Sequence, residues 1–327
     1  MAEVEPQALS SREEINRLIN LAKKARVKIL FVQVYRGNKA WFSSRLADPT
    51  PYEKCLKGVS EDPLKLLIKE AHRSGIEVHA WLNMLSLGSN KDARMLKKYG
   101  IHILTRNPQE KNNLEDYKID NQYFLEPGDT RVRNELSKII EEILGGYPDL
   151  DGIQFDYVRY PDKNPDYGYT EMNMERFKKT SLAWEDWKRA QVTETLEHFV
   201  RKARQLHPGL RVSATGCMPY QRAYYEAYQD WPSWLNRGLL DFVTIMDYSP
   251  DPSEFERWIL AVKGKVDNFR KVNIGIGAYK LTRSPEKFEE ELRFSEGAGA
   301  GESVIFHYAS LLENSALINC LEIKPRR

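Results

Sequence analysis

The chain alternates between two hydrophobic patterns along its whole length. Short runs of β-branched and aromatic residues, typical of strands, are separated by segments in which apolar residues recur every three to four positions, typical of amphipathic helices. The seven clearest strand patterns lie at 27–37, 76–83, 150–158, 210–217, 240–248, 272–279 and 302–309. Strands that alternate with helices in this way predict a parallel sheet.

Capping residues mark where the intervening helices begin and end. Ser10 or Ser11 precedes a helix running to about Ala25, and Asp62 followed by proline opens a helix that ends at Ser74 and a glycine. Further helices are expected from about Asp129 after a short strand, and at 182–205, 252–262 and 285–296. One long excursion, at about 84–122 with a helix near 91–99, interrupts the alternation.

This order of elements favours a (β/α)8 TIM barrel over a doubly wound sheet. A doubly wound nucleotide-binding sheet normally has a glycine-rich phosphate loop after its first strand, and GIGAYK at 275–280 neither fits that spacing nor opens a helix. We therefore expect a single catalytic barrel domain over 1–327. Only 4–6 stands where a first strand belongs, so that strand is expected to be truncated, or its place filled by another segment.

Residue parity along the strands separates the barrel interior from the face that meets the helices. In four strands the aliphatic residues share one parity, whereas polar, aromatic or small residues share the other. The second set, expected to point inward, is Phe31, Gln33 and Tyr35; His79, Trp81 and Asn83; Gly152, Gln154 and Asp156; and Asn273, Gly275, Gly277 and Tyr279. Polar residues near the carboxyl ends of barrel strands are where such barrels hold their sites.

Composition excludes several classes of function. The 49 basic and 47 acidic residues give a net charge of +2, which argues against nucleic acid as a partner. No run approaches the roughly 20 apolar residues of a membrane span, and no apolar signal segment follows the first methionine. The three cysteines form no zinc-binding spacing, and no motif calls for a cofactor or metal. Nothing in the sequence indicates an oligomeric state.

The stretch LDGIQFDYVRYP, at 150–161, holds the candidate chemistry. Its apolar run ends in Asp156, followed closely by Arg159 and Tyr160. The aspartate is either the end of a strand entering a solvated loop or a catalytic carboxylate at the barrel mouth. Gln154 or Arg159 could hold the carboxylate ionised, although Arg159 could also be a simple ion-pair partner.

The sequence resembles the glycosyl-hydrolase-like 10 family of bacterial proteins. The resemblance rests on LDGIQFDYVRYP preceded by FLEPGDTRVRNEL, and on VKILFVQVYRGNKAWFSS, VNIGIGAYK and GESVIFHYASL. It implies a TIM-barrel glycoside hydrolase, distantly related to α-amylase-like barrels, from a family whose members are often exported and in some cases act on peptidoglycan. Two positions depart from the common family pattern: Tyr157 replaces a second aspartate, and Met246 replaces a glutamine.

Glycoside hydrolysis usually needs two carboxylates. Asp156 is the first candidate, as nucleophile or base. The second is open between Asp247, whose parity faces the helices, and Glu126, which could instead be a helix-start acid. The expected substrate-binding residues are Gln33, Tyr35, His79, Trp81, Asn83, Gln154, Arg159, Tyr160, Tyr248, Tyr279 and His307.

Two other functions remain possible from the residues. One is a carbohydrate-binding barrel that has lost hydrolysis, because no second acid is evident. The other is a metal-assisted hydrolase, because His79, Asp156 and His307 lie on three different predicted strands.

Overall fold

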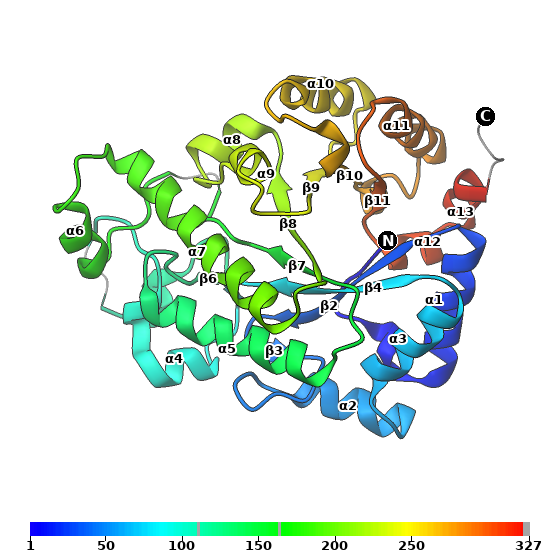
Figure 1. The fold of residues 1–327 in the computed structure, drawn as a ribbon, viewed down its shortest axis with the longest axis horizontal. Coiled ribbons are helices and arrows are strands. Elements are labelled where there is room, and N and C mark those ends of the chain that lie inside the picture. Colours follow the sequence, from blue (N-terminus) through cyan, green and yellow to red (C-terminus); the bar gives the residue numbers. More distant parts are fainter. Residues whose placement is uncertain (110–111, 163–164, 323–327) are drawn as a thin grey trace.

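A nearly closed barrel of parallel strands forms the centre of the protein (Figure 1). The computed structural model describes residues 1–109, 112–162 and 165–322. Within these residues the barrel has eight strands, in spatial order β1 (Ala2–Glu3), β2 (Ile29–Arg36), β4 (Glu77–Asn83), β7 (Gly152–Asp156), β8 (Arg211–Cys217), β9 (Phe242–Asp247), β10 (Val272–Ile276) and β11 (Ser303–Ile305). The TIM-barrel prediction is confirmed.

The first strand is short, as expected, and lies just before the predicted segment 4–6. β1 pairs in parallel with β2, with Ala2 opposite Phe31. At the other end of the sheet β11 pairs with β10, and in the described part of the chain no ladder joins β11 to β1. Near this seam, Lys28 Nζ forms an ion pair with Glu302 Oε1 at 2.8 Å, which joins the residue before β2 to the residue before β11.

Helices surround the barrel (Figure 1), and three of them begin at capping residues that the sequence predicts, Ser11, Asp62 and Asp129. The Ser11 side chain accepts a hydrogen bond from the Glu14 amide, and Asp62, Asp129 and Asp251 cap their helices in the same way. The main helices are α1 (Arg12–Lys24), α2 (Thr50–Val59), α3 (Pro63–Arg73), α5 (Thr130–Gly146), α7 (Trp184–Leu206), α10 (Pro252–Lys263), α11 (Pro285–Gly297) and α13 (Ser315–Glu322). No helix among the described residues is long and apolar enough to cross a membrane.

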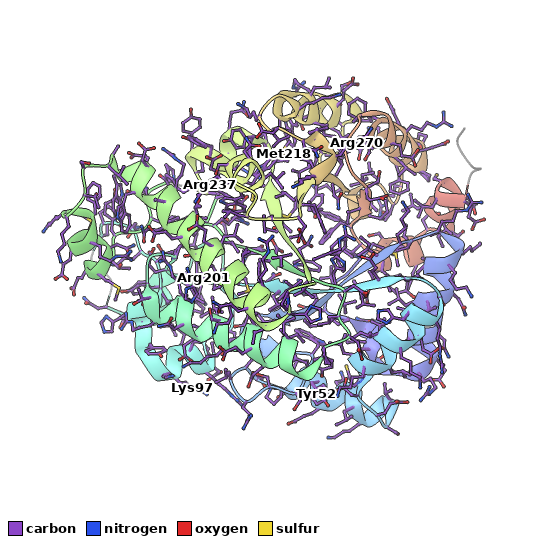
Figure 2. All side chains as sticks on the ribbon, viewed as in Figure 1. Tyr52, Lys97, Arg201, Met218, Arg237 and Arg270 are labelled. Atoms are coloured by element: carbon purple, nitrogen blue, oxygen red, sulfur yellow. The ribbon has the colours of Figure 1, made fainter. Side chains whose placement is uncertain are left out.

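Side chains fill the space between the strands and the surrounding helices (Figure 2). The outer aliphatic residues of the strands, such as Val32 and Ile153, belong to the large core shared with the helices. A separate small cluster lies inside the barrel, reaches up to the pocket at the carboxyl ends of the strands, and consists of Ala2, Ile29, Phe31, Trp81, Phe242 and Val304. The parity predicted for most strands therefore holds.

Tyr35 is the exception to the predicted parity. Gln33 pairs with Trp81 and Tyr35 with Leu82, so one extra residue of β2 is accommodated between them as a bulge. A bulge of one residue reverses the faces beyond it. Tyr35 therefore packs into the outer core and accepts a hydrogen bond from Asn38 Nδ2 at 3.2 Å, away from the barrel interior.

The excursion after β4 builds over one end of the barrel. It contains β5 (Ser86–Gly88), α4 (Arg94–Tyr99) and two single-turn helices, and β5 pairs with β6 (Tyr123–Phe124) in a two-stranded sheet. Together with α6 (Glu171–Phe177), α4 lies on the left of Figure 1, whereas the N-terminus and α13 lie on the right. Loops after β4 and β7 therefore cover the same part of the molecule.

We predict that Gly152→Ala destabilises the protein. A Cβ atom at Gly152 would overlap the imidazole of His79, which is fully buried and cannot move into solvent. Overpacking of this kind costs typically about 1–3 kcal/mol, measured as the free energy of unfolding in urea.

Gly145→Ala is the matched control for this substitution. A Cβ atom at Gly145, in α5, would meet nothing within 4 Å. Alanine is favoured over glycine in a helix by up to about 1 kcal/mol, so the control should be neutral or stabilising. Equal effects of the two substitutions would contradict the close fit between Gly152 and His79.

Candidate active site

A pocket of about 180 Å³ opens at the carboxyl ends of the barrel strands. Its polar lining, the polar wall, consists of Gln33, Asn83, Gln154, Asp156, Thr215 and Thr244. Its largely aromatic lining, the aromatic wall, consists of Trp81, Tyr157, Tyr248 and Phe306 with Met246. Such a mixture of apolar surface and a few convergent polar groups is typical of ligand sites.

Asp156, at the end of β7, is the buried carboxylate of this pocket. Its Oδ1 accepts hydrogen bonds from the Tyr157 amide at 2.7 Å and from Thr215 Oγ1 at 2.5 Å. Its Oδ2 accepts a hydrogen bond from Trp81 Nε1 at 3.0 Å. The donors come from β4, β8 and the residue after β7, so the carboxylate is fixed from three directions.

Two opposing influences set the pKa of Asp156. Burial raises the pKa, because the ionised form loses its hydration, and this effect is the largest. The hydrogen bonds from Thr215, the Tyr157 amide and Trp81, together with the positive charge of Arg159, lower it. The net result is a pKa above the ordinary value of 3.8.

Amide side chains connect the other polar positions. Gln33 Nε2 donates to Asn83 Oδ1 at 3.2 Å, and Gln154 Nε2 donates to Thr244 Oγ1 at 3.1 Å. Gln33 Oε1 also accepts the Glu5 amide at 3.3 Å. These contacts hold the amides rigid while the Asn83 amino group and the Gln154 carbonyl keep the capacity to bond a ligand.

Two glycines of β10 and its following loop make room for the aromatic wall. Tyr248 stacks on Phe306 with ring centroids 4.9 Å apart. A Cβ atom at Gly277 would lie 2.9 Å from Tyr248 Cβ, and one at Gly275 would lie 2.7 Å from the Ile245 carbonyl oxygen. The two glycines of VNIGIGAYK therefore leave the space that Tyr248 and the neighbouring backbone of β9 occupy.

Arg159 and Tyr160 lie buried behind the pocket wall. The Arg159 guanidinium lies over the Tyr157 ring, 4.6 Å from its centroid, and donates to Asp162 Oδ1 at 2.9 Å. The Tyr160 hydroxyl donates to Glu126 Oε1 at 2.5 Å. Neither side chain lines the pocket, so both support the loop after β7 rather than meet a ligand directly.

Glu126 is also buried outside the pocket. Besides Tyr160, its carboxylate accepts the Gly128 amide at 3.0 Å, and burial raises its pKa. The structure thus places Glu126 between the loop after β6 and the loop after β7, where it connects the two.

Asp247 points from β9 toward the helices, as its parity predicts. It is fully buried, and among the described residues its Oδ2 has no hydrogen-bond partner. Glu291 of α11 is equally buried and has neither carboxylate oxygen bonded there. Burial raises the pKa of Asp247 and of Glu291 to about 8, and the Asp247 charge adds to the shift at Glu291.

His79 lies at the opposite end of the barrel interior. It precedes Asn83 by four residues in β4, or roughly 13 Å along a strand, and its Nε2 contacts Glu77 Oε2 at 3.1 Å. His79, Asp156 and His307 are therefore not brought together. No group of three or more histidine, cysteine or acidic residues in the described ranges could hold a metal ion.

Thr215 and Phe306 belong to the pocket but were not among the predicted site residues. In RVSATGC the small polar residues Ser213 and Thr215 share one parity, and β8 places them opposite Gln154 and Thr244. The same alternation that identified Gln154 could therefore have identified Thr215. Phe306 gives no such signal, because it follows the three-residue strand β11.

Comparison with known sequences identifies related proteins along most of the chain. The family described as Glycosyl hydrolase-like 10 matches residues 1–291. The glycosyl hydrolase DigH of Escherichia coli is 25% identical, and the match covers 90% of this chain and 71% of that protein. The glycosyl hydrolase YngK of Bacillus subtilis is 22% identical over 72% of this chain and 49% of its own length.

Solved structures with the same fold include glycosidases. An α-galactosidase from Geobacillus stearothermophilus matches with a TM-score of 0.57 at 10% identity, over 95% of this chain and 39% of that one. An α-amylase from Geobacillus thermoleovorans matches with a TM-score of 0.55 at 11% identity, over 95% and 71%. At these identities the likeness concerns the TIM-barrel fold.

We predict that the Asp247–Glu291 pair makes stability fall as the pH rises. A carboxyl whose pKa is raised by folding stabilises the native state while protonated, and this contribution is lost between its unfolded pKa near 4 and about 8. Asp247→Asn removes one proton-linked group and the negative charge that helps to raise the pKa of Glu291. We expect its free energy of unfolding to fall less steeply from pH 5 to 8.5.

At pH 8 the free energy of unfolding of Asp247→Asn should exceed that of the wild type by on the order of 1–2 kcal/mol. Urea denaturation at several pH values measures it. Glu256→Gln, on the exposed face of α10, is the control and should keep the wild-type slope. An unchanged slope in Asp247→Asn would contradict a protonated buried pair.

Proposed function

Because the chain belongs to the glycosyl hydrolase-like 10 family, we propose that it hydrolyses glycosidic bonds of a polysaccharide in the barrel-mouth pocket. The observation that supports this most directly is the buried Asp156 at the end of β7, held by three donors in a pocket that aromatic side chains also line. Active sites of TIM-barrel enzymes lie at this end of the barrel.

Asp156 acts in this proposal as the nucleophile, or as the base if the reaction inverts the anomeric centre. Both roles need the ionised carboxylate, which the donors Thr215, Trp81 and the Tyr157 amide favour. Oδ2 accepts one hydrogen bond from protein, from Trp81, so it retains a lone pair for an anomeric carbon or a water molecule. Gln33, Asn83 and Gln154 then bind sugar hydroxyl groups.

Bacterial cell-wall glycan is the first polysaccharide to test. The resemblance of the sequence to a family with members that act on peptidoglycan supports this choice. Asp156 and Arg36 are the charged residues that line the pocket, and its other lining residues are uncharged. Such a lining suits an uncharged sugar ring. Apolar ring faces can meet the aromatic wall while hydroxyl or acetamido groups meet the amides.

A carbohydrate-binding barrel without hydrolysis is the second candidate. The observation favouring it is that, among the described residues, Asp156 is the one carboxylate lining the pocket. Glu126 and Asp247 are both buried elsewhere, and the rim carboxylate of Glu5 is paired with Arg36 Nη1 at 2.9 Å. In this case glycans would bind without turnover.

We predict that Asp156→Asn lowers hydrolysis at least about a hundredfold, because an amide can neither attack the anomeric carbon nor activate water. Release of reducing ends from peptidoglycan and from plain polysaccharides measures the effect in wild type and variant. Glu126→Gln is the comparison variant: a smaller loss is expected, since Glu126 lies outside the pocket. Equal activity of wild type and Asp156→Asn would refute the assignment, and glycan binding without any wild-type turnover would favour the binding barrel.

We further predict the pH dependence of kcat/KM. Because Asp156 must be ionised and burial raises its pKa, activity should fall on acidification through a one-proton limb above pH 3.8. Thr215→Val removes a donor that lowers this pKa, so the limb should move to higher pH. Thr244→Val, which alters the pocket without touching Asp156, should leave the limb in place.

A further inference from the structure

We propose that Tyr279 and His307 form a second sugar subsite, which binds the ring adjoining the one in the pocket. The inference rests on the proposed carbohydrate site, but it holds equally for a hydrolase and for a binding barrel. It assigns these two side chains a place along the glycan rather than a part in bond cleavage.

The stacked rings of Tyr279 and His307 form an aromatic surface at the pocket rim. Their planes are parallel within 8°, with centroids 6.1 Å apart. Tyr279 is 41% exposed although it packs against other rings. Burial lowers the pKa of His307, so the surface is uncharged at neutral pH.

This surface is continuous with the aromatic wall of the pocket. The Tyr279 ring meets two pocket-lining rings edge-on, Tyr248 at 5.9 Å and Phe306 at 5.8 Å between centroids. His307 directly follows Phe306 in the chain, and their rings are 5.2 Å apart. A ligand leaving the pocket along this wall therefore passes directly onto Tyr279.

The size of the pocket requires such a second surface if the ligand is an oligosaccharide. The pocket volume of about 180 Å³ lies below the roughly 300–1,000 Å³ of sites for drug-sized ligands. It suits one sugar ring, so the neighbouring unit must lie at the rim.

The part of the rim beside β1 and β2 is less suited to a sugar ring. There Glu5 and Arg36 form an exposed ion pair, with side chains 59% and 44% exposed. A sugar placed on it would have to replace the hydration of two charges. On Tyr279 and His307 the ring instead covers apolar surface that is already exposed to water.

Chain-length dependence of binding tests the subsite. Chito-, cello- and malto-oligosaccharides of one to four units are titrated calorimetrically into Asp156→Asn, which prevents turnover. In the series that binds, affinity should rise from one unit to two or three. Tyr279→Ala in the same background should lower the affinity for the longer oligosaccharides about three- to tenfold and leave monosaccharide affinity unchanged. Tyr279→Trp should retain the affinity for the longer oligosaccharides.

Tyr225→Ala is the matched control, because Tyr225 is a 64% exposed aromatic whose ring contact is with Tyr224, outside the pocket. A chain-length gain that survives Tyr279→Ala overturns the subsite. Absence of binding by every sugar in the panel overturns both the subsite and the carbohydrate pocket.

Turnover is measured separately on the wild type. If affinity rises with chain length in a way that depends on Tyr279, but the wild type releases no reducing ends, the subsite is supported and only the proposal of hydrolysis is refuted. With turnover, Tyr279→Ala should raise KM for longer substrates more than it lowers kcat, which a general loss of structure would not do.

Discussion

The burial of the Asp156 carboxylate is the constraint on which the site depends. A buried carboxylate is costly unless hydrogen bonds replace its hydration. The donors are supplied by Trp81 of β4, Thr215 of β8 and the amide after β7. The parallel registers pair Asn83 with Asp156 and Gln154 with both Trp81 and Ser213, so Thr215 lies level with Asp156 and Trp81 reaches it from two residues earlier along the strands. A slip of one residue in either ladder would turn a donor toward the helices.

The support of this carboxylate extends outward through a second set of buried polar contacts. Gln229 accepts the Cys217 amide at 2.8 Å and donates to the carbonyl groups of Thr215 and Val158, at 3.2 and 3.3 Å. It thereby connects the strand that carries Thr215 with the loop that follows Asp156. Tyr160 and Glu126 tie the same loop to the excursion. Sites held by such outer contacts keep their geometry as a ligand enters.

Strand periodicity was sufficient to predict the barrel, the position of Asp156 and most of the polar wall. It placed Asp247 on the helix-facing side, where the structure has it. It failed at Tyr35, because the bulge in β2 leaves no mark in the order of polar and apolar residues. Periodicity also did not reveal that His79 and Asn83 lie at different ends of the barrel interior, because inward parity does not distinguish the two ends. The position of Phe306 in the pocket and the burial of Glu126 outside it depend on contacts between segments far apart in the chain, which no local pattern encodes.

The two departures from the common family pattern both lie in the pocket. Tyr157 and Met246 are the positions at which the resemblance led us to expect an aspartate and a glutamine, and both side chains line the cavity. Relative to that expectation, each offers an aromatic or thioether surface in place of a polar group. The Tyr157 ring is moreover covered by the Arg159 guanidinium, so its place in the wall is structurally fixed. A ligand in the pocket therefore meets aromatic and thioether surface at these two positions, while the amides and Asp156 are available to its polar groups.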